Sequence, residues 1–378
     1  MVISNKPLQF IIAILIACLP VFGFSNTPSE GKPVQTETTA VAHEAAPESG
    51  EETSEIKEQI KEVIGHHVLD GHDFSLFEYE GQHIGFSLPI ILWDNGVHFF
   101  SSSKFHHGES VAESNGNFYK LYHETIYKTD AAGTLTEEHG HPTNAKPIDL
   151  SITKGVLTIM VVALLMFLLF TSLAKSYVKN GGISAGVGRF FEPIVLYIRD
   201  EIAIPNIGEK HYKKYMSYLL TIFFFVWFLN IFGLTPLGIN VTGNIAITFG
   251  LAVITFLITN LTANKNYWGH IFWMPGVPTP MKVILAPIEL LGVFIKPFAL
   301  MIRLYANIFA GHVVLMSLIG LIFIFKSWLG SSLSFMLSFA ISIIEILVAL
   351  LQAYIFTMLS ALYFGSAVEE HHHEEAHH

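Results

Sequence analysis

The feature that most limits the fold of this chain is a set of long apolar stretches in its second half. Three of them, residues 156–174, 215–232 and 245–261, are each suited to one membrane crossing, and two longer ones lie within residues 283–325 and 331–364. A helix of about 20 apolar residues spans the hydrocarbon core of a bilayer. We therefore predict an all-α multi-pass membrane protein with five transmembrane helices, the last two long enough to run strongly tilted.

Composition agrees with a membrane protein and excludes several functions. Hydrophobic residues make up 51% of the 378 residues and charged residues only 14%, against about a quarter charged in soluble domains. The formal charge of -10 argues against a nucleic-acid partner. Cys18 is the only cysteine, so we expect no disulfide framework and no multi-cysteine metal site. The sequence contains no glycine-rich phosphate loop, and we expect no metal and no cofactor.

The first residues are typical of a targeting segment. Residues 1–25 predict a signal peptide, with Lys6 in a short positive region, an apolar segment over residues 8–17 and small residues near Ser25. A lipoprotein signal ending at Cys18 is an alternative. In either case the new N-terminus is delivered outside the cytoplasm. Residues 26–62 are acidic and have almost no large apolar side chains, which predicts a disordered tether.

Residues 63–148 predict a small, histidine-rich extracytoplasmic module that is rich in β-structure. Residues 83–92 are strand-like, the Trp-Asp-Asn-Gly sequence at residues 93–96 favours a hairpin turn, and residues 97–100 can return beside them. Residues 118–127, followed by Asp-Ala-Ala-Gly, repeat this pattern. We interpret the histidines as solvated surface residues, with a metal-binding or proton-collecting role as the alternative. Residues 369–378 are a solvated cytoplasmic His/Glu tail in this interpretation.

The connection between the first two crossings predicts an amphipathic helix over residues 187–203 that lies flat on the membrane. Its apolar side chains recur at helical spacing, at Phe190, Phe191, Ile194, Val195, Ile198 and Ile202. Most basic residues of the membrane region lie in this first connection, and the third connection carries Lys265 and Lys282. Because basic connections stay in the cytoplasm, we predict the N-terminus outside the cytoplasm and the C-terminus inside it.

Ionisable and amide side chains within the last two apolar stretches are the candidate functional residues. They are Glu289, Lys296, Arg303, Asn307 and His312 in the fourth stretch and Glu345 and Gln352 in the fifth. A charged side chain at the bilayer centre costs about 2.5–3.5 kcal/mol or more, so each one is expected to serve a function. A set of structural pairs that lock helix packing is the alternative. Pro287 and Pro297 could kink or break the fourth stretch.

An antiparallel hairpin of these two helices, with its tip near Trp328, brings side chains to matching depths. Arg303 lies 25 positions before the tip and Gln352 24 after it, while His312 lies 16 before and Glu345 17 after. An imidazole beside a carboxylate can form a proton relay. Arg303 keeps its proton and is therefore a barrier or an electrostatic partner. No acidic residue of the chain lies at its depth, so we expect its counter-charge to come from another subunit.

Three blocks of sequence resemble subunit a of the F-type ATP synthase membrane sector. They are residues 296–312, with Lys-Pro, Ile-Arg-Leu-Tyr-Ala-Asn and Ala-Gly-His; residues 345–356, which end in Leu-Gln-Ala-Tyr-Ile-Phe; and residues 229–236, Leu-Asn-Ile-Phe-Gly-Leu-Thr-Pro. Their order and spacing agree with that family over a membrane domain at residues 149–368. The N-terminal module is longer than the short N-terminus of the family, so its role does not follow from the resemblance.

The resemblance implies a stator subunit that is not catalytic by itself. Two offset half-channels would load and unload protons on a rotating ring of small subunits, so that proton flow drives ATP synthesis. Arg303 would face the carboxylate of the ring, and Gln352 and Asn307 would support it. The implied partners are this ring, a peripheral-stalk subunit, the rest of the complex and membrane lipids, in a bacterial inner membrane. The resemblance does not decide between proton and sodium coupling.

The resemblance also implies roles for the remaining candidates. His312 and Glu345 would line the outer half-channel, through which protons arrive, and Glu289 would lie near its cytoplasmic counterpart. In some members of the family the acidic residue is on the penultimate helix and the histidine on the last one. The two residue types are exchanged in this chain, which preserves the pair because both would face the same channel.

Two other classes of function fit the sequence less well. A secondary transporter predicts inverted repeats with matching interrupted helices, and the chain has no internal repeat. A membrane metalloenzyme needs pairs of histidines at helical spacing inside the membrane region. His312 is the only histidine within a predicted crossing, which argues against that class.

Overall fold

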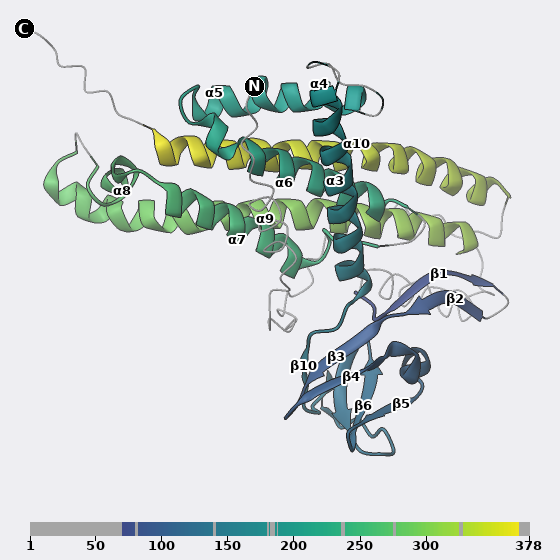
Figure 1. Cartoon of the computed structure of the whole chain (residues 1–378). Coiled ribbons are helices and arrows are strands. Elements are labelled where there is room, and N and C mark those ends of the chain that lie inside the picture. Colours follow the sequence, from purple (N-terminus) through teal and green to yellow (C-terminus); the bar gives the residue numbers. More distant parts are fainter. Residues whose placement is uncertain are drawn as a thin grey trace, which may run out of the picture.

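The computed structural model describes residues 70–369 apart from residues 80–81, 139–140, 180, 182–185, 187, 236–238, 275–276 and 325–327. The predicted signal peptide and tether, and residues 370–378 of the predicted tail, lie outside the described residues. In the described part, a small β-rich module is followed by a helical region. The module lies at the beginning of the first long helix, with the other helices further along it (Figure 1).

The β-rich module consists of short antiparallel strands. β1 (Asp73–Tyr79) pairs with β2 (Gln82–Ser87); β3 (Pro89–Trp93) lies between β4 (Val97–Ser101) and β10 (Ile148–Asp149); β6 (Asn117–Tyr122) lies between β5 (Val111–Ser114) and β7 (Thr125–Thr129); and β8 (Glu137–Glu138) pairs with β9 (His141–Pro142). A 3-10 helix, η1 (Ser102–Gly108), connects β4 to β5. The predicted hairpin at residues 89–101 is present, with residues 94–96 in its turn.

The core of the module follows from the alternation of side chains along its strands. In β3 and β4 every second residue is buried, and these residues meet η1 and the β5-β6-β7 sheet. The buried apolar cluster comprises Ile90, Leu92, Phe100, Phe105, Ala112, Tyr119, Leu121 and Ile126. The β-rich module therefore buries a single small core between its sheets.

The prediction of one strand over residues 118–127 was wrong. The chain turns back at His123 and Glu124, so that β6 and β7 form a hairpin with Tyr122 opposite Thr125. Both turn residues have left-handed backbones, with φ of 45° and 57°. Two consecutive left-handed residues make the hairpin turn that matches the twist of paired strands. The sequence lacks the Asn-Gly or Asp-Gly that usually signals this turn, so the pattern of apolar residues suggested one continuous strand.

The helical region contains five helices long and apolar enough to cross a membrane. They are α3 (Lys154–Lys179), α6 (Tyr212–Gly233), α7 (Ile245–Thr262), α9 (Thr279–Ile324) and α10 (Trp328–Val368). The prediction of five apolar helices is confirmed. α9 continues through Pro287 and Pro297, so neither proline breaks it. A short helix, α8 (Lys265–Phe272), joins α7 to α9.

The predicted amphipathic segment forms three consecutive helical pieces. These are α4 (Gly188–Tyr197), the π-helical turn η2 (Ile198–Ala203) and α5 (Ile204–Ile207). The π-helical turn comes just before Pro205, which has no N–H to donate and crowds the carbonyl of the preceding turn. Ile198 and Ile202 are fully buried, and Phe190, another residue of the predicted apolar face, is 63% exposed.

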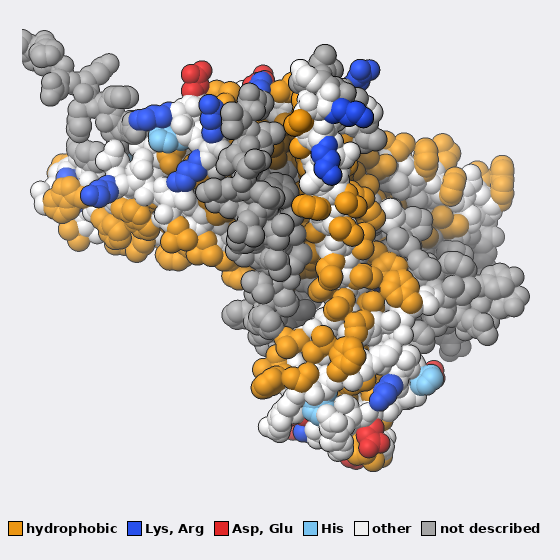
Figure 2. Space-filling view, viewed as in Figure 1, with side chains coloured by type: hydrophobic (Ala, Val, Ile, Leu, Met, Phe, Trp, Pro, Cys, Tyr) orange, Lys and Arg blue, Asp and Glu red, His pale blue; other side chains and the backbone are white. Residues whose placement is uncertain are grey.

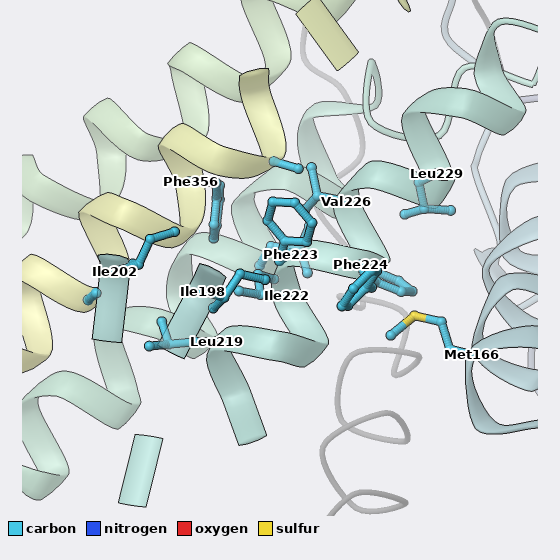
Figure 3. Close-up of a cluster of buried hydrophobic side chains, with 14 of the residues drawn as sticks. Met166, Ile198, Ile202, Leu219, Ile222, Phe223, Phe224, Val226, Leu229 and Phe356 are labelled. Carbon is cyan, nitrogen blue, oxygen red and sulfur yellow. The ribbon is translucent and has the colours of Figure 1, made fainter. Parts of the chain in front are cut away.

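The helical core is centred on α6. Figure 3 shows Leu219, Phe223, Phe224 and other apolar side chains of α6 between Met166 of α3, Ile198 and Ile202 of η2, and Phe356 of α10. Many apolar side chains of α3, α9 and α10 remain exposed on the outside of this core. Figure 2 shows an apolar band over the helices, with Lys and Arg side chains gathered near α4, α5 and α8, away from the module.

Candidate functional site

The polar residues predicted from the sequence lie on α9 and α10, which pack against each other. One side of α9 faces the core, where Leu300, Leu304 and Ile308 are buried. Arg303 and Asn307 are exposed on another side of the same helix. The 3.6-residue period explains this division, because positions four apart share a face. The guanidinium of Arg303 is therefore carried on an outer surface of the helical region.

Large apolar side chains are exposed on both helices in this part of the structure, among them Phe298 and Ile302 on α9 and Leu350 and Leu351 on α10. In the part of the chain that the structure describes, no carboxylate forms an ion pair with Arg303. An arginine side chain stays charged, so this surface presents a permanent positive charge without an acidic partner among the described residues.

Asn307 and Gln352 are brought together across the two helices. The Nδ2 of Asn307 donates a hydrogen bond of 2.9 Å to Oε1 of Gln352. Gln352 is only 2% exposed, and its Nε2 has no hydrogen-bond partner among the described residues. Counting positions from the hairpin tip predicted that Gln352 lies opposite Arg303. The hydrogen bond instead joins Gln352 to Asn307, which lies one helical turn nearer the tip.

His312 and Glu345 lie where α6, α9 and α10 meet. Both are buried, at 7% and 5% exposure. A Cβ added to Gly311 would lie 2.8 Å from Oε1 of Glu345, and a Cβ added to Gly233 would lie 3.4 Å from Nε2 of His312. The carboxylate therefore contacts the backbone of α9 one residue from His312, and the imidazole is directed at the end of α6. Both carboxylate oxygens lack hydrogen-bond partners among the described residues.

Several uncharged polar residues beside this pair were missed as functional candidates from the sequence. Asn230 on α6 donates from Nδ2 to the carbonyl of Ala349, four positions after Glu345, at 3.2 Å. Its Oδ1 accepts from the hydroxyl of Thr242 at 2.7 Å. The signal available was an asparagine in an otherwise apolar stretch, which is weaker than a charge because amides occur in many membrane helices.

A second polar region lies on the other side of Arg303 along the chain. A small cavity between α7, α9 and α10 is lined by Thr255, Asn260, Tyr267, Lys296 and Tyr363, among others. α7 supplies a stripe of buried threonines at positions 248, 255 and 259, which were also missed. Their spacing of seven and four was visible in the sequence, although threonine at such spacing commonly bonds to its own helix, as Thr259 does.

Glu289 is associated with this second region through Tyr267 of α8. Burial raises the pKa of the Tyr267 hydroxyl, and the negative charge of Glu289 raises it further. Glu289 is half-buried on α9, two turns before Lys296. At 1.5 Å per residue, Arg303 lies about 10 Å along α9 from Lys296 and about 13 Å from His312. A fixed positive charge thus separates two regions that contain titratable groups.

This arrangement places side chains that can exchange protons on both sides, along α9, of one that cannot. His312, Glu345 and Glu289 can gain and lose protons, and Arg303 cannot. Among residues 70–369 as described, no group of three His, Cys, Asp or Glu side chains is placed to hold a metal ion. The chemistry available to these side chains is proton exchange and electrostatic attraction.

Comparisons with known proteins agree with this chemistry. The family model "ATP synthase A chain" matches residues 156–365, and a family model described as a domain of unknown function matches residues 63–150. ATP synthase subunit a of Anaeromyxobacter sp. (strain Fw109-5) is 39% identical over 264 residues, which cover 67% of this chain and 64% of that protein. The subunit a of Chloroherpeton thalassium is 42% identical over 61% of this chain and 70% of its own length. That of Chlorobium phaeobacteroides (strain BS1) is 44% identical, again over 61% and 70%.

Proposed function

The chain belongs to the family of ATP synthase subunit a, the non-catalytic, proton-conducting stator subunit of the membrane sector, and we propose that Arg303 separates its two proton half-channels. The observation that carries this proposal is the exposed guanidinium on an apolar face, unpaired with any carboxylate of the described residues. A charge on a protein surface that faces the interior of the bilayer is costly unless it has a partner. A carboxylate on a neighbouring rotating ring would supply that partner.

The ring is the proposed partner of the outer face of α9 and α10. Large apolar side chains on this face are exposed in the chain by itself, among them Phe298, Ile302, Ile343, Leu347 and Leu351. Two long helices with such a face can lie against several ring helices in succession. The Arg303 charge would favour the ionised form of a ring carboxylate as it passes, which releases its proton.

Asn307 and Gln352 would support Arg303 from the adjacent turn. Their hydrogen bond of 2.9 Å fixes the Gln352 amide with its Oε1 toward α9. Gln352 is buried, whereas Asn307 is exposed on α9, so Asn307 would be the member of the pair that reaches an ionised ring carboxylate.

The two half-channels would use the two polar regions. His312 and Glu345 would carry protons from the outer side to the ring, with Asn230 beside them. Glu289, with the cavity lined by Tyr267 and Lys296, would carry them to the cytoplasm. Arg303 lies between the two regions along α9, so a proton would have to cross by riding on the ring.

The orientation in a bacterial inner membrane follows from charge. Lys and Arg side chains gather near α4, α5 and α8 (Figure 2), and such residues stay in the cytoplasm. The β-rich module at the other end would then be extracytoplasmic, delivered by a signal peptide, and the C-terminus cytoplasmic. The α4–η2–α5 segment would lie along the cytoplasmic membrane surface among lipids, where a peripheral-stalk subunit could also bind.

The test is ATP-driven acidification of inverted membrane vesicles that contain the whole complex. We expect Arg303→Ala to abolish acidification at unchanged subunit content, because the barrier and the ring's counter-charge are both lost. Arg189→Ala, which removes an exposed arginine of α4, is the matched control and should retain acidification. Undiminished acidification with Arg303→Ala would overturn the assignment of this residue.

A further inference from the structure

Asp70 lies at the junction between the β-rich module and the helical region, outside the part that matches the ATP synthase family. Its carboxylate reaches the first turn of α3, where Oδ1 accepts from the N–H of Gly155 at 2.9 Å and Oδ2 accepts from the Thr153 hydroxyl at 2.8 Å. The side chain is half-buried. It therefore remains within reach of water while contacting the interior of the molecule.

A small cavity separates Asp70 from the connection between α6 and α7. Asp70 and Lys154 line one side of it, and Ile239, Asn240 and Asn244 line the other. It leaves about 10 Å³ for the centre of a water molecule, which is room for about one water. The cavity thus joins a residue of the N-terminal module to a loop of the proton-conducting domain.

Asn240 supplies an unused hydrogen-bond donor at this cavity. The residue is 9% exposed, and its Oδ1 accepts from the N–H of Gly243 at 2.9 Å. Its Nδ2 is buried and has no hydrogen-bond partner among the described residues. A buried amide donor normally has a partner, and a water in the cavity would supply one.

The same loop leads directly to the buried His312 and Glu345. The carbonyl of Ile239, a residue lining the cavity, lies against Gly233 of α6, and Nε2 of His312 lies against the same glycine. Thr242, two residues after Asn240, donates to Asn230, which in turn donates to Ala349 of α10. Polar groups of this loop therefore lie between the Asp70 cavity and the level of His312 and Glu345.

We propose that Asp70 is the outermost proton acceptor of the outer half-channel, so that the N-terminal module contributes a residue to proton uptake. This inference rests on the proposed function. The Asp70 carboxylate takes a proton from external water and gives it to a water held in the cavity by Asn240; that water passes a proton on toward His312 and Glu345, and the carboxylate is regenerated. No other reactant is needed, because each proton that leaves Asp70 is replaced from the external solution.

The electrostatic surroundings of Asp70 suit this exchange. Burial raises the pKa of its carboxyl above the ordinary value, although the bonds from Gly155 and Thr153 and the charges of Lys154 and His72 oppose the rise. A carboxyl with a raised pKa holds a proton closer to neutral pH and can exchange it there. These four residues are the groups that face Asp70 from α3 and from the module.

The competing interpretation is that Asp70 only caps the first turn of α3. Asn is as good a cap as Asp, so Asp70→Asn keeps an acceptor for Gly155 and removes the exchangeable proton. Asp130→Asn is the matched control, because Asp130 is exposed in the module and also accepts from a backbone N–H, that of Thr134. Asp70→Glu restores a carboxyl at the same place.

The experiment measures ATP synthesis by the whole complex in inverted vesicles, driven by an imposed membrane potential, with the luminal pH varied. The lumen of these vesicles corresponds to the outside of the cell. We expect Asp70→Asn to lower the rate, relative to wild type, by about an order of magnitude at a luminal pH of about 8, and to approach wild type at about pH 6, where protons are abundant. Asp70→Glu should recover most of the rate and Asp130→Asn all of it.

The other outcomes distinguish a failure of this inference from a failure of the proposed function. A rate for Asp70→Asn equal to wild type at every luminal pH would overturn the role of Asp70, as would a pH-independent loss that follows the amount of assembled complex. Arg303→Ala in the same vesicles tests the proposed function independently. If Arg303→Ala is inactive while Asp70→Asn is unaffected, the half-channel mechanism stands and this inference fails.

Discussion

At the scale of single residues, the candidate site depends on glycines that let buried polar groups approach a helix backbone. The Glu345 carboxylate contacts α9 at Gly311, and the His312 imidazole contacts α6 at Gly233. A Cβ at position 311 would come within 2.8 Å of Oε1 of Glu345, whereas a Cβ at position 233 would meet Nε2 of His312 at 3.4 Å, an ordinary contact. The position of the Glu345 carboxylate thus depends partly on a glycine that carries no chemistry itself.

Gly311→Ala is predicted to displace the Glu345 carboxylate. The new Cβ would lie 2.8 Å from Oε1, which is closer than carbon and oxygen tolerate, so the flexible end of the Glu345 side chain must move away. We expect the complex to assemble with proton pumping reduced several-fold, measured as ATP-driven acidification. Gly292→Ala on the same helix is the control, because a Cβ there meets no atom within 4 Å. Equal pumping by both variants would contradict the proposed position of Glu345 in the channel.

The charged residues of the site could be found from the sequence, and most of their partners could not. Arg303 and Glu345 are conspicuous because a charge in an apolar stretch carries a large cost. Asn230 and Asn240 carry no such cost. Their contacts depend on the packing of α6 against α10 and on the loop after α6 that shares a cavity with Asp70. Counting positions along the predicted hairpin placed Gln352 opposite Arg303, whereas the hydrogen bond joins Gln352 to Asn307. Packed helices can shift by a turn without changing which faces meet, so the count could not fix the exact pair.

At the scale of helices and strands, His72 joins β10 to the β6–β7 turn. It is 3% exposed, with Nε2 2.8 Å from Asp149 and Nδ1 3.9 Å from Glu124. Burial works to lower the pKa of His72, but the hydrogen bond of its ring to Asp149 and the negative charges of Asp149 and Glu124 outweigh burial and raise it to about 10. The same interactions lower the pKa of Asp149 and of Glu124 against the effect of their burial.

The stability of the module is predicted to fall at both acid and alkaline pH. His72 contributes fully below its unfolded pKa of about 6.5, and this contribution is lost as the pH rises through about 10. The two carboxylates contribute above their ordinary pKa values and lose their contribution as the pH falls through the lowered ones. Hydrogen exchange at the N–H of Leu150, which bonds to Ile91 of β3, should report the slowest opening at pH values between these limits. His72→Gln should remove the alkaline decrease, and a decrease that persists in this variant would assign it to another group.

The α5 segment is held against α10 by a close approach at Gly365. A Cβ at this position would overlap the carbonyl of Asn206, and the Nδ2 of Asn206 lies 3.4 Å from the sulfur of Met358. Since a backbone carbonyl cannot move without its helix, we predict that Gly365→Ala separates α5 from α10. Faster trypsin cleavage in the Arg199–Lys210 region of the solubilised complex would report the separation. Gly269→Ala, where a Cβ meets nothing within 4 Å, should leave cleavage unchanged. Unchanged cleavage of Gly365→Ala as well would contradict the prediction.

Helices were easier to predict than strands. The apolar stretches at residues 215–232 and 245–261 lie inside α6 and α7, because hydrophobic length alone identifies such helices. Pro287 and Pro297 left open whether α9 was broken, and membrane helices tolerate proline where neighbouring groups satisfy the freed backbone. The β6–β7 turn was missed since left-handed His123 and Glu124 are uncommon turn residues.

At the scale of the whole molecule, the proposed half-channels require the two polar regions to face opposite aqueous compartments. The helices that carry them are crossed by an apolar band, and Lys and Arg gather at the end away from the β-rich module (Figure 2). Five crossings would put the two ends of the described chain on opposite sides. If the module and the basic end were on the same side, His312 and Glu289 could not serve separate half-channels.

Labelling with a membrane-impermeant thiol reagent tests this arrangement in the assembled complex. With Cys18 replaced by serine, Asn115→Cys places a thiol at an exposed turn of the module, and Lys210→Cys places one between α5 and α6, also exposed. We expect Asn115→Cys to react in spheroplasts and Lys210→Cys to react only in inverted vesicles, because basic connections stay in the cytoplasm. Reaction of both thiols from one side would mean that the chain crosses the membrane an even number of times between them. The separation of the half-channels by Arg303 would then lose its structural basis, whatever the activity of the Arg303 variants.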